Sequence, residues 1–242
     1  MPGFGYDPQV GATQFTVTKV NAAGETIGKI TVEYLNGLSD GNQIYPAKDG
    51  YIYILTQTGA FYKYKPSGKL LWKKFAGLGN SQVLTDNFGN VYVAAHLTAS
   101  VRKYNSDGDQ LWEVFIGKNL NTTNVKTIID NAGNLYKTGT FLSNIDFDPG
   151  EAVTMLTASN GSNAYIQKLS PDGKLVWVVQ TKNNSHINDI RPLDIVLDAT
   201  GTNVYVTGYY KGTVNFNTEG GTTLAQSNGK ADAFVMRLRQ CN

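Results

Sequence analysis

The chain has 242 residues, of which 21 are Lys or Arg and 19 are Asp or Glu, so its formal net charge is +2. This near balance excludes the basic surplus that a dedicated nucleic-acid binder collects on one face. The single cysteine, Cys241, excludes an intrachain disulfide and a cysteine zinc site, and two histidines exclude a three-histidine metal site. The 26 glycines and 14 tyrosines favour an all-β chain with many tight turns.

Residues 1–13 contain three glycines and two prolines, which predicts an extended N-terminal arm. Phe4 and Tyr6 are its only aromatic side chains, so they are candidates for contact with a partner. The arm has neither the basic start nor the apolar stretch of a secretory signal. No later run approaches the roughly 18 apolar residues of a membrane span, so we expect no membrane insertion.

Three short phrases recur along the rest of the chain in a fixed order. An apolar strand runs into Asp-x-x-Gly and a Val-Tyr-Val-like strand. The next strand ends in Lys-Leu or Lys-Tyr, and a turn with hairpin residues such as Asp-Gly leads into a strand that contains Trp. The Trp phrase occurs at Gly68–Trp72, Gly108–Trp112 and Gly173–Trp177, with a degraded copy at Gly24–Gly28.

Units of four antiparallel strands at a spacing of roughly 40 residues are typical of the blades of a β-propeller. We therefore expect an all-β fold in which residues 14–242 form a propeller, most simply of four blades. The expected strands are 43–49, 51–57, 60–66 and 70–76 in blade one; 81–87, 91–97, 99–105 and 110–116 in blade two; 125–130, 134–140, 163–169 and 175–181 in blade three; and 193–198, 203–209 and 232–239 in blade four.

Blade four has only three strands in this scheme. Residues 26–34 are expected to supply the fourth by pairing with 232–239, which would close the ring and hide a free edge. The additional strand 14–20 either covers an outer edge or belongs to a contact between subunits. A five-bladed ring, or a ring that another subunit completes, is the alternative.

Insertions lengthen the same loop in blades three and four, at residues 140–163 and 210–232. We expect both insertions to be ordered, because they carry apolar side chains that can pack against their blades or a neighbouring subunit. These side chains are Val153, Met155, Leu156, Phe216 and Leu224.

Two stretches resemble the SBBP-type β-propeller repeat. They are residues 133–177, with Asp-Phe-Asp-Pro-Gly at 146–150, and residues 203–238, with Asn-Phe at 215–216. The shorter units at 43–117 are similar to NHL or PQQ-type propeller repeats. The resemblance implies a propeller with mostly extracellular or cell-surface binding and scaffolding roles. The cofactor constellation of the PQQ-dependent dehydrogenases is missing, so neither that activity nor a cofactor is implied.

Asp146 and Asp148 are weak candidates for a calcium site, because carboxylates are hard oxygen ligands. Gly150 stands where a third ligand would be needed, and the sister unit has the neutral Asn215 and Asn217 in place of the two acids. A turn in which the Asp side chains accept hydrogen bonds from the backbone explains the pattern better. We therefore expect no metal.

Three tryptophans recur at one position of the unit, as Trp72, Trp112 and Trp177. They could stack on sugar rings, but a large apolar residue that occurs once per blade favours packing between blades. His186 beside Asp189 could act as a general base. No matching nucleophile accompanies them, so a solvated loop is favoured and we expect no catalytic residue.

These features predict a non-enzymatic structural or adhesive module of a larger surface assembly, such as a bacteriophage virion. Its partners would be other protein subunits, and its location extracellular or on the virion surface, without a recognisable signal peptide. The alternative is a lectin-like propeller that binds surface glycans through Tyr209 and Tyr210, with Asn215 and Asn217 nearby. A propeller lyase or hydrolase would need convergent acids or a histidine cluster, which the sequence lacks.

Overall fold

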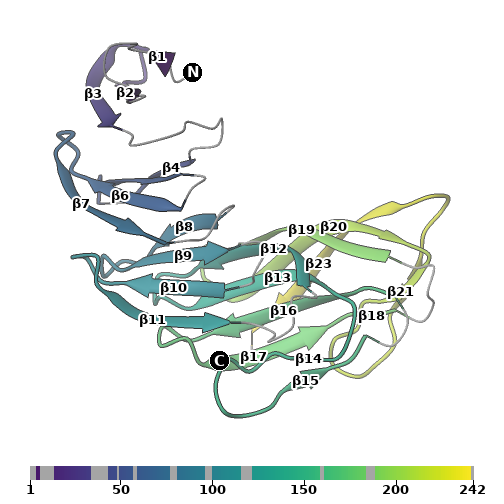
Figure 1. Ribbon diagram of the computed structural model, residues 1–242. Helices are drawn as coiled ribbons and strands as arrows, with labels where there is room; N and C mark the ends of the chain where they lie inside the picture. The colour runs from purple at the N-terminus through teal and green to yellow at the C-terminus, as the bar shows by residue number, and fades with distance from the viewer. Residues whose placement is uncertain are drawn as a thin grey trace. The chain divides into compact units, whose positions relative to one another are not determined.

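The computed structural model describes residues 4–5, 14–33, 43–47, 49–56, 59–76, 81–95, 100–115, 122–158, 161–183 and 189–240. All regular secondary structure in these residues is β-strand, as the composition predicts (Figure 1). Within the same residues no helix is long and apolar enough to span a membrane. The chain divides into two compact units, Met1–Gly79 and Asn80–Asn242, which are described separately below.

The N-terminal unit contains two antiparallel sheets. The first has three strands in the order β1-β2-β3, and the second has four strands in the order β4-β5-β6-β7. The second sheet is blade one, with the strand order that the sequence predicts. The strands are β1 (Phe4–Gly5), β2 (Gln14–Val20), β3 (Thr26–Glu33), β4 (Gln43–Pro46), β5 (Ile52–Leu55), β6 (Ala60–Tyr64) and β7 (Leu70–Phe75).

The C-terminal unit contains the other three predicted blades. Blades two and three have four strands each, and blade four has three in the order β19-β20-β23. Blade two is β8 (Ser81–Thr85), β9 (Val91–Ala95), β10 (Ser100–Tyr104) and β11 (Gln110–Phe115); blade three is β12 (Thr122–Ile129), β13 (Leu135–Phe141), β16 (Asn163–Leu169) and β17 (Leu175–Gln180); blade four is β19 (Asp189–Leu197), β20 (Asn203–Lys211) and β23 (Asp232–Arg239).

Both loop insertions fold into small hairpins. In blade three β14 (Ile145–Asp146) pairs with β15 (Met155–Leu156), and in blade four β21 (Thr213–Asn215) pairs with β22 (Leu224–Gln226) and with β18 (Lys182–Asn183). The expectation that the insertions are ordered is therefore confirmed for their described residues.

The side chains that anchor the insertions differ from most of those expected. Val153, Met155 and Leu224 are 69%, 50% and 57% exposed, so they do not anchor the hairpins. Phe147 and Val214 are fully buried and do so instead. The reason is the alternation of a short hairpin, which turns one residue inward and the next to solvent.

Each hairpin between the third and fourth strands of a unit has an irregularity at one and the same position. The register shifts directly after the lysine of the third strand, as expected for a β-bulge, which bends the strand and increases its twist. The shifts lie at Lys19/Val20, Lys63/Tyr64, Lys103/Tyr104 and Lys168/Leu169. The hairpin β2–β3 is thus built like the second half of a blade.

The Asp-x-x-Gly-Asn phrase forms the turn between the first and second strands. In blade two, Asp86 Oδ1 accepts hydrogen bonds from the backbone N–H groups of Phe88 and Asn90 at 2.9 Å each. Its Oδ2 accepts from the hydroxyl of Tyr92 at 3.0 Å. Asp130 plays the same part in blade three. The recurring Asp-x-x-Gly-Asn spacing therefore stabilises the turn, because the Asp carboxylate accepts hydrogen bonds from backbone N–H groups of the turn.

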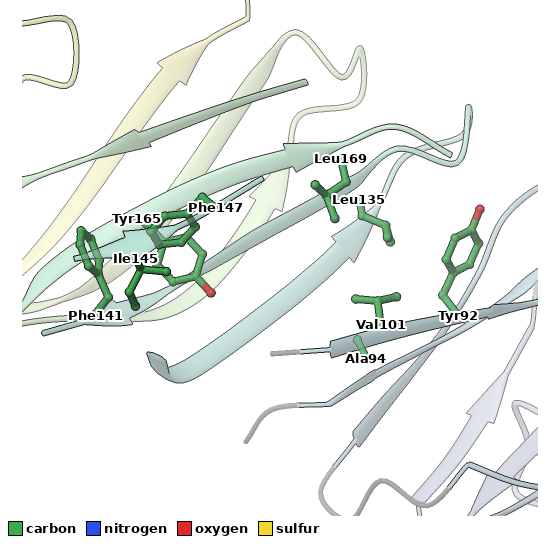
Figure 2. Close-up of a cluster of buried hydrophobic side chains, with 9 residues drawn as sticks. All are labelled: Tyr92, Ala94, Val101, Leu135, Phe141, Ile145, Phe147, Tyr165 and Leu169. Atoms are coloured by element: carbon green, nitrogen blue, oxygen red, sulfur yellow. The ribbon is translucent and has the colours of Figure 1, made fainter. Parts of the chain in front are cut away.

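The core of the C-terminal unit lies between neighbouring blades. Figure 2 shows Ala94 and Val101 of blade two facing Leu135 and Leu169 of blade three, and all four are at most 2% exposed. A second cluster joins blade three to blade four through Ile166, among others. Blade three therefore packs with one face on blade two and with the other face on blade four.

The expected pairing of 26–34 with 232–239 joins the two units and stays a prediction. Within the described residues β3 pairs with β2, and β23 pairs with β20. Of the arm 1–13, only Phe4–Gly5 lies within the described residues, where it pairs with β2. The total number of blades also stays a prediction.

Candidate functional site

A ladder of Tyr, Lys and Trp crosses the sheet of each complete blade. The Lys ammonium lies 5.6, 5.2 and 5.1 Å from the Tyr ring centroid in blades one, two and three. The Tyr and Trp rings are 6.1, 5.8 and 6.3 Å apart. Such distances are those of cation–π and aromatic pairs. The ladders are Tyr53–Lys63–Trp72, Tyr92–Lys103–Trp112 and Tyr136–Lys168–Trp177.

In blades two and three the ladder binds the last turn of the following blade. Trp112 Nε1 and Lys103 Nζ both donate to the carbonyl oxygen of Pro171, at 3.2 and 2.9 Å. Lys168 Nζ donates in the same way to Oε1 of Gln240 at 2.9 Å, and Gln240 stands where the repeat places Pro171. Trp112 and Trp177 therefore pack between blades, in agreement with the packing that the sequence favours.

Blade four carries only the first two members of the ladder. Tyr205 lies directly opposite Arg237, but within the described residues no strand pairs with the other edge of β23. Val235 lies on the face that packs on the following blade in blades two and three, and it is 73% exposed. The residues at the equivalent position of the other blades are each 0% exposed, and they are Phe61, Val101 and Ile166.

One side of blade four is covered by no described strand of the C-terminal unit, and we call this apolar surface with charged edges the open face. Val196 is 50% exposed and pairs with Tyr205, and Tyr209 pairs with Ala233. Arg191 donates to Asp189 at 2.7 Å, and this hydrogen bond together with the carboxylate charge raises the pKa of Arg191. The open face is made of Val196, Tyr205, Thr207, Tyr209, Val235 and Arg237.

A cavity of about 520 Å³ lies along the edge of β23 that pairs with no other described strand. Its floor is an aromatic cluster in which the Phe216 ring lies 5.3 Å from Tyr210 and 5.1 Å from Phe234. Its rim is polar and includes Asn217 and Glu219. In blade three the matching aromatic cluster is completely buried, and it consists of Phe141, Phe147 and Tyr165.

The paired acids and amides of the insertions hold their own loops. Asp146 Oδ1 accepts from the backbone N–H groups of Asp148 and Thr154 at 3.1 and 2.9 Å. Asn215 Oδ1 accepts from Asn217 and Thr223 at 3.0 and 2.8 Å. A neutral amide thus holds the loop as the carboxylate does, because the backbone N–H groups need only an oxygen that accepts their hydrogen bonds. Among the described residues no group of three or more His, Cys, Asp or Glu could hold a metal ion.

The predicted binding residues are brought together only in part. Tyr210 and Asn217 line the cavity, and Tyr209 lies on the open face. Asn215 is buried, and its amide donates to the carbonyl of Gly221. The side chain of Phe4 is not described, and Tyr6 lies outside the described residues, as does His186.

Sequence reasoning missed the residues that expose this surface. In the sequence, Val235 and Arg237 follow the same alternation as the residues at the equivalent positions of the other blades. The sequence therefore does not indicate that they are exposed. The sequence predicts that Phe216 packs against its blade, and its ring also forms the floor of the cavity.

Comparisons with known proteins agree with the repeat architecture. A family model named PQQ_2 and described as outer membrane protein assembly factor BamB matches residues 13–232. No curated protein matches the chain. Together with the four sheets, the family match confirms the predicted β-propeller repeat fold.

The chain is also similar to solved structures of low sequence identity. A protein from Lactobacillus plantarum is 18% identical, with 93% of this chain and 68% of that chain covered and a TM-score of 0.51. A protein of unknown function from Bacteroides caccae is 14% identical, with 98% and 72% covered and a TM-score of 0.41. The WD40 domain of Toxoplasma gondii coronin is 13% identical, with 91% and 54% covered and a TM-score of 0.48. At these identities the likeness concerns the fold alone.

Proposed function

We propose that this chain, which belongs to the PQQ_2 family described as outer membrane protein assembly factor BamB, is a non-enzymatic module that binds other proteins of a larger assembly. The binding surface is the open face of blade four. The description of the family names a protein assembly factor, which supports an interaction role.

One observation carries the proposal. Val235 is 73% exposed at a position that is 0% exposed in each of the other blades. Burying one such side chain contributes about 1.5–3 kcal/mol, and Val196 and the two tyrosines of the open face add to it. A contiguous apolar surface of this kind marks an interaction site on a folded protein.

The experiment is photo-crosslinking in the cells that produce the protein. A benzoylphenylalanine at position 235 should form a covalent adduct with another protein chain, which mass spectrometry then identifies. The matched control is position 153, because Val153 is 69% exposed but lies on the insertion of blade three. Adducts of equal yield at both positions, or none at 235, would contradict the proposal.

The second candidate function is carbohydrate binding in the cavity beside β23. Its aromatic floor and the polar rim of Asn217, Thr218 and Glu219 combine the two kinds of contact that sugars need. On a glycan array, Thr218→Ala with Glu219→Gln should then abolish binding. Glu151→Gln, an exposed carboxylate of the other insertion, is the control and should leave binding intact.

The location of the assembly is part of the same proposal. A structural or adhesive part at an extracellular or virion surface would use the open face as a fixed contact with a neighbouring subunit. Immunogold labelling of purified particles and of whole cells tests this location directly. Labelling confined to the cell interior would rule it out.

A further inference from the structure

The hairpin β2–β3 is built like the last two strands of a blade, but it has no tryptophan. Lys19 lies opposite Gly28, whereas the corresponding lysine of each complete blade lies opposite a Trp. A Cβ at Gly28 would lie 3.9 Å from Lys19 Cβ, and no other atom of the described residues beyond its chain neighbours would lie within 4 Å. The side-chain position of Gly28 is therefore open.

A cavity of about 120 Å³ lies at this position. It lies between the hairpin and blade one, and the residues that face it include Val17, Lys19, Gly28, Ile52, Pro66 and Ser67. All of them belong to the N-terminal unit, so the cavity is formed within one compact unit.

The hairpin packs on blade one as blade two packs on blade three. Val17 precedes Lys19 by two residues and packs against a buried cluster of blade one. In the same way Val101 precedes Lys103 by two residues and packs in the core between blades two and three. The cavity therefore takes the position at which blade two presents Trp112 to blade three.

Blade one also offers the hydrogen-bond acceptor that this position needs. In the C-terminal unit, Trp112 Nε1 donates to the carbonyl oxygen of Pro171. Pro66 corresponds to Pro171, because the turns 65–69 and 170–174 are closed by the same two backbone hydrogen bonds. The cavity is therefore an indole site of the repeat from which the indole is missing.

The size and charge of the cavity define the kind of ligand. Its volume suits one enclosed aromatic ring, since an apolar cavity of roughly 150 Å³ takes up benzene. Ile27 also lines it and is 56% exposed, which leaves an opening for a second ring. Lys19 and Lys29 line it as well, whereas none of its described lining residues is an Asp or Glu. An anionic group on the ring is therefore favoured.

We infer that this cavity binds a small anionic molecule with an indole-like ring, in place of the missing tryptophan. The Lys19 ammonium would lie over the ring, as Lys63 Nζ lies 6.0 Å from the centroid of the Trp72 ring in blade one. The ring N–H would donate to the carbonyl oxygen of Pro66. This inference does not rest on the proposed function, because the open face belongs to the C-terminal unit.

Isothermal titration calorimetry of the full chain, with indole-3-acetate as the probe, tests the inference. The unchanged chain should bind the probe. Gly28→Trp should abolish binding, because it fills the cavity with the chain's own indole. Thr31→Trp is the matched control and should leave the affinity unchanged, since position 31 is exposed and lies on the other face of β3. Lys19→Met should weaken binding about two- to fivefold, because it removes the cation over the ring.

Gly28→Leu fills the cavity with a smaller side chain, and it should also abolish binding if Gly28→Trp does not fold. No binding by the unchanged chain, or equal affinity of the unchanged chain and the filled variants, would overturn the inference. N-acetyltryptophanamide, in which the indole is joined to peptide groups, distinguishes the two sources of such a ring. Tighter binding of this compound than of indole-3-acetate would mean that the cavity holds a Trp side chain of a protein, and would also overturn the inference.

Discussion

At the scale of single residues, Trp112 shows how one recurring residue of the repeat joins neighbouring blades. Trp112 lies against Tyr92 and donates to Pro171 of the next blade. Trp112→Ala should therefore destabilise the protein by about 3 kcal/mol, the lower end for a large aromatic, because the ring is half-buried. Trp112→Phe keeps an aromatic ring but loses the hydrogen bond to Pro171, which contributes about 1 kcal/mol to the free energy of unfolding. Urea unfolding measures both values, and an unchanged midpoint for Trp112→Ala would refute the packing role.

Lys137 is a second residue whose environment sets a measurable property. It is 0% exposed, and burial lowers its pKa to about 7. Between pH 7 and the ordinary lysine pKa near 10.5, the unfolded chain then binds more protons than the folded chain. The free energy of unfolding should rise with pH over this window, by at most about 1.4 kcal/mol per pH unit.

Lys137→Met should remove that slope and stabilise the protein at neutral pH, because the apolar side chain fills the same space without a charge. Lys174→Met is the control, since Lys174 is exposed on a turn. Urea unfolding at several pH values between 7 and 10 measures the slope. A slope that persists in Lys137→Met would mean that another group causes it.

At the scale of elements, the two insertions are related in sequence but differ in what covers them. Phe147 is completely buried beside Tyr165, whereas Phe216 is half-buried and faces the cavity at the edge of β23. Phe147→Ala should cost about 3–5 kcal/mol of unfolding free energy, and Phe216→Ala about half as much. Equal costs in thermal unfolding would indicate that a fourth strand already covers Phe216.

The strands of the blades were predictable because three independent signals agree at each of them. Alternating apolar residues, the glycine turn between the first two strands and the Trp phrase all indicate the same bounds in blades one to three, and in blades two and three the turn has the full Asp-x-x-Gly-Asn phrase. The anchors of the insertions were not predictable in this way. A hairpin of two or three residues per strand has too short an alternation to reveal whether Val153 or Phe147 faces the core.

At the scale of the whole molecule, the sequence predicts repeating blades but not how the last one is completed. Residues 26–34 carry the length and apolar pattern of a fourth strand, and for this reason the sequence assigns them to blade four. In the structure they pair with β2, a local partner across a five-residue turn at 21–25. Local pairing of this kind costs little chain entropy. The further pairing of β3 with β23 stays a prediction, because the two strands belong to different units.

The candidate site was predictable only in part for a related reason. Tyr210 and Asn217 belong to a distinctive loop, so they stand out in the sequence. The exposure of Val235 depends on whether another blade packs on this face of blade four, and a valine in a strand is apolar in either case. Its place in the site follows only from a comparison of equivalent positions in several folded blades.

The central claim is that the open face of blade four binds another protein. Photo-crosslinking from position 235 in the cells that produce the protein tests it most directly, with position 153 as the control because Val153 is 69% exposed on the insertion of blade three. The account predicts an adduct with another protein chain at position 235 and a much lower yield at position 153. Equal yields at both positions, or no adduct at position 235, would contradict it.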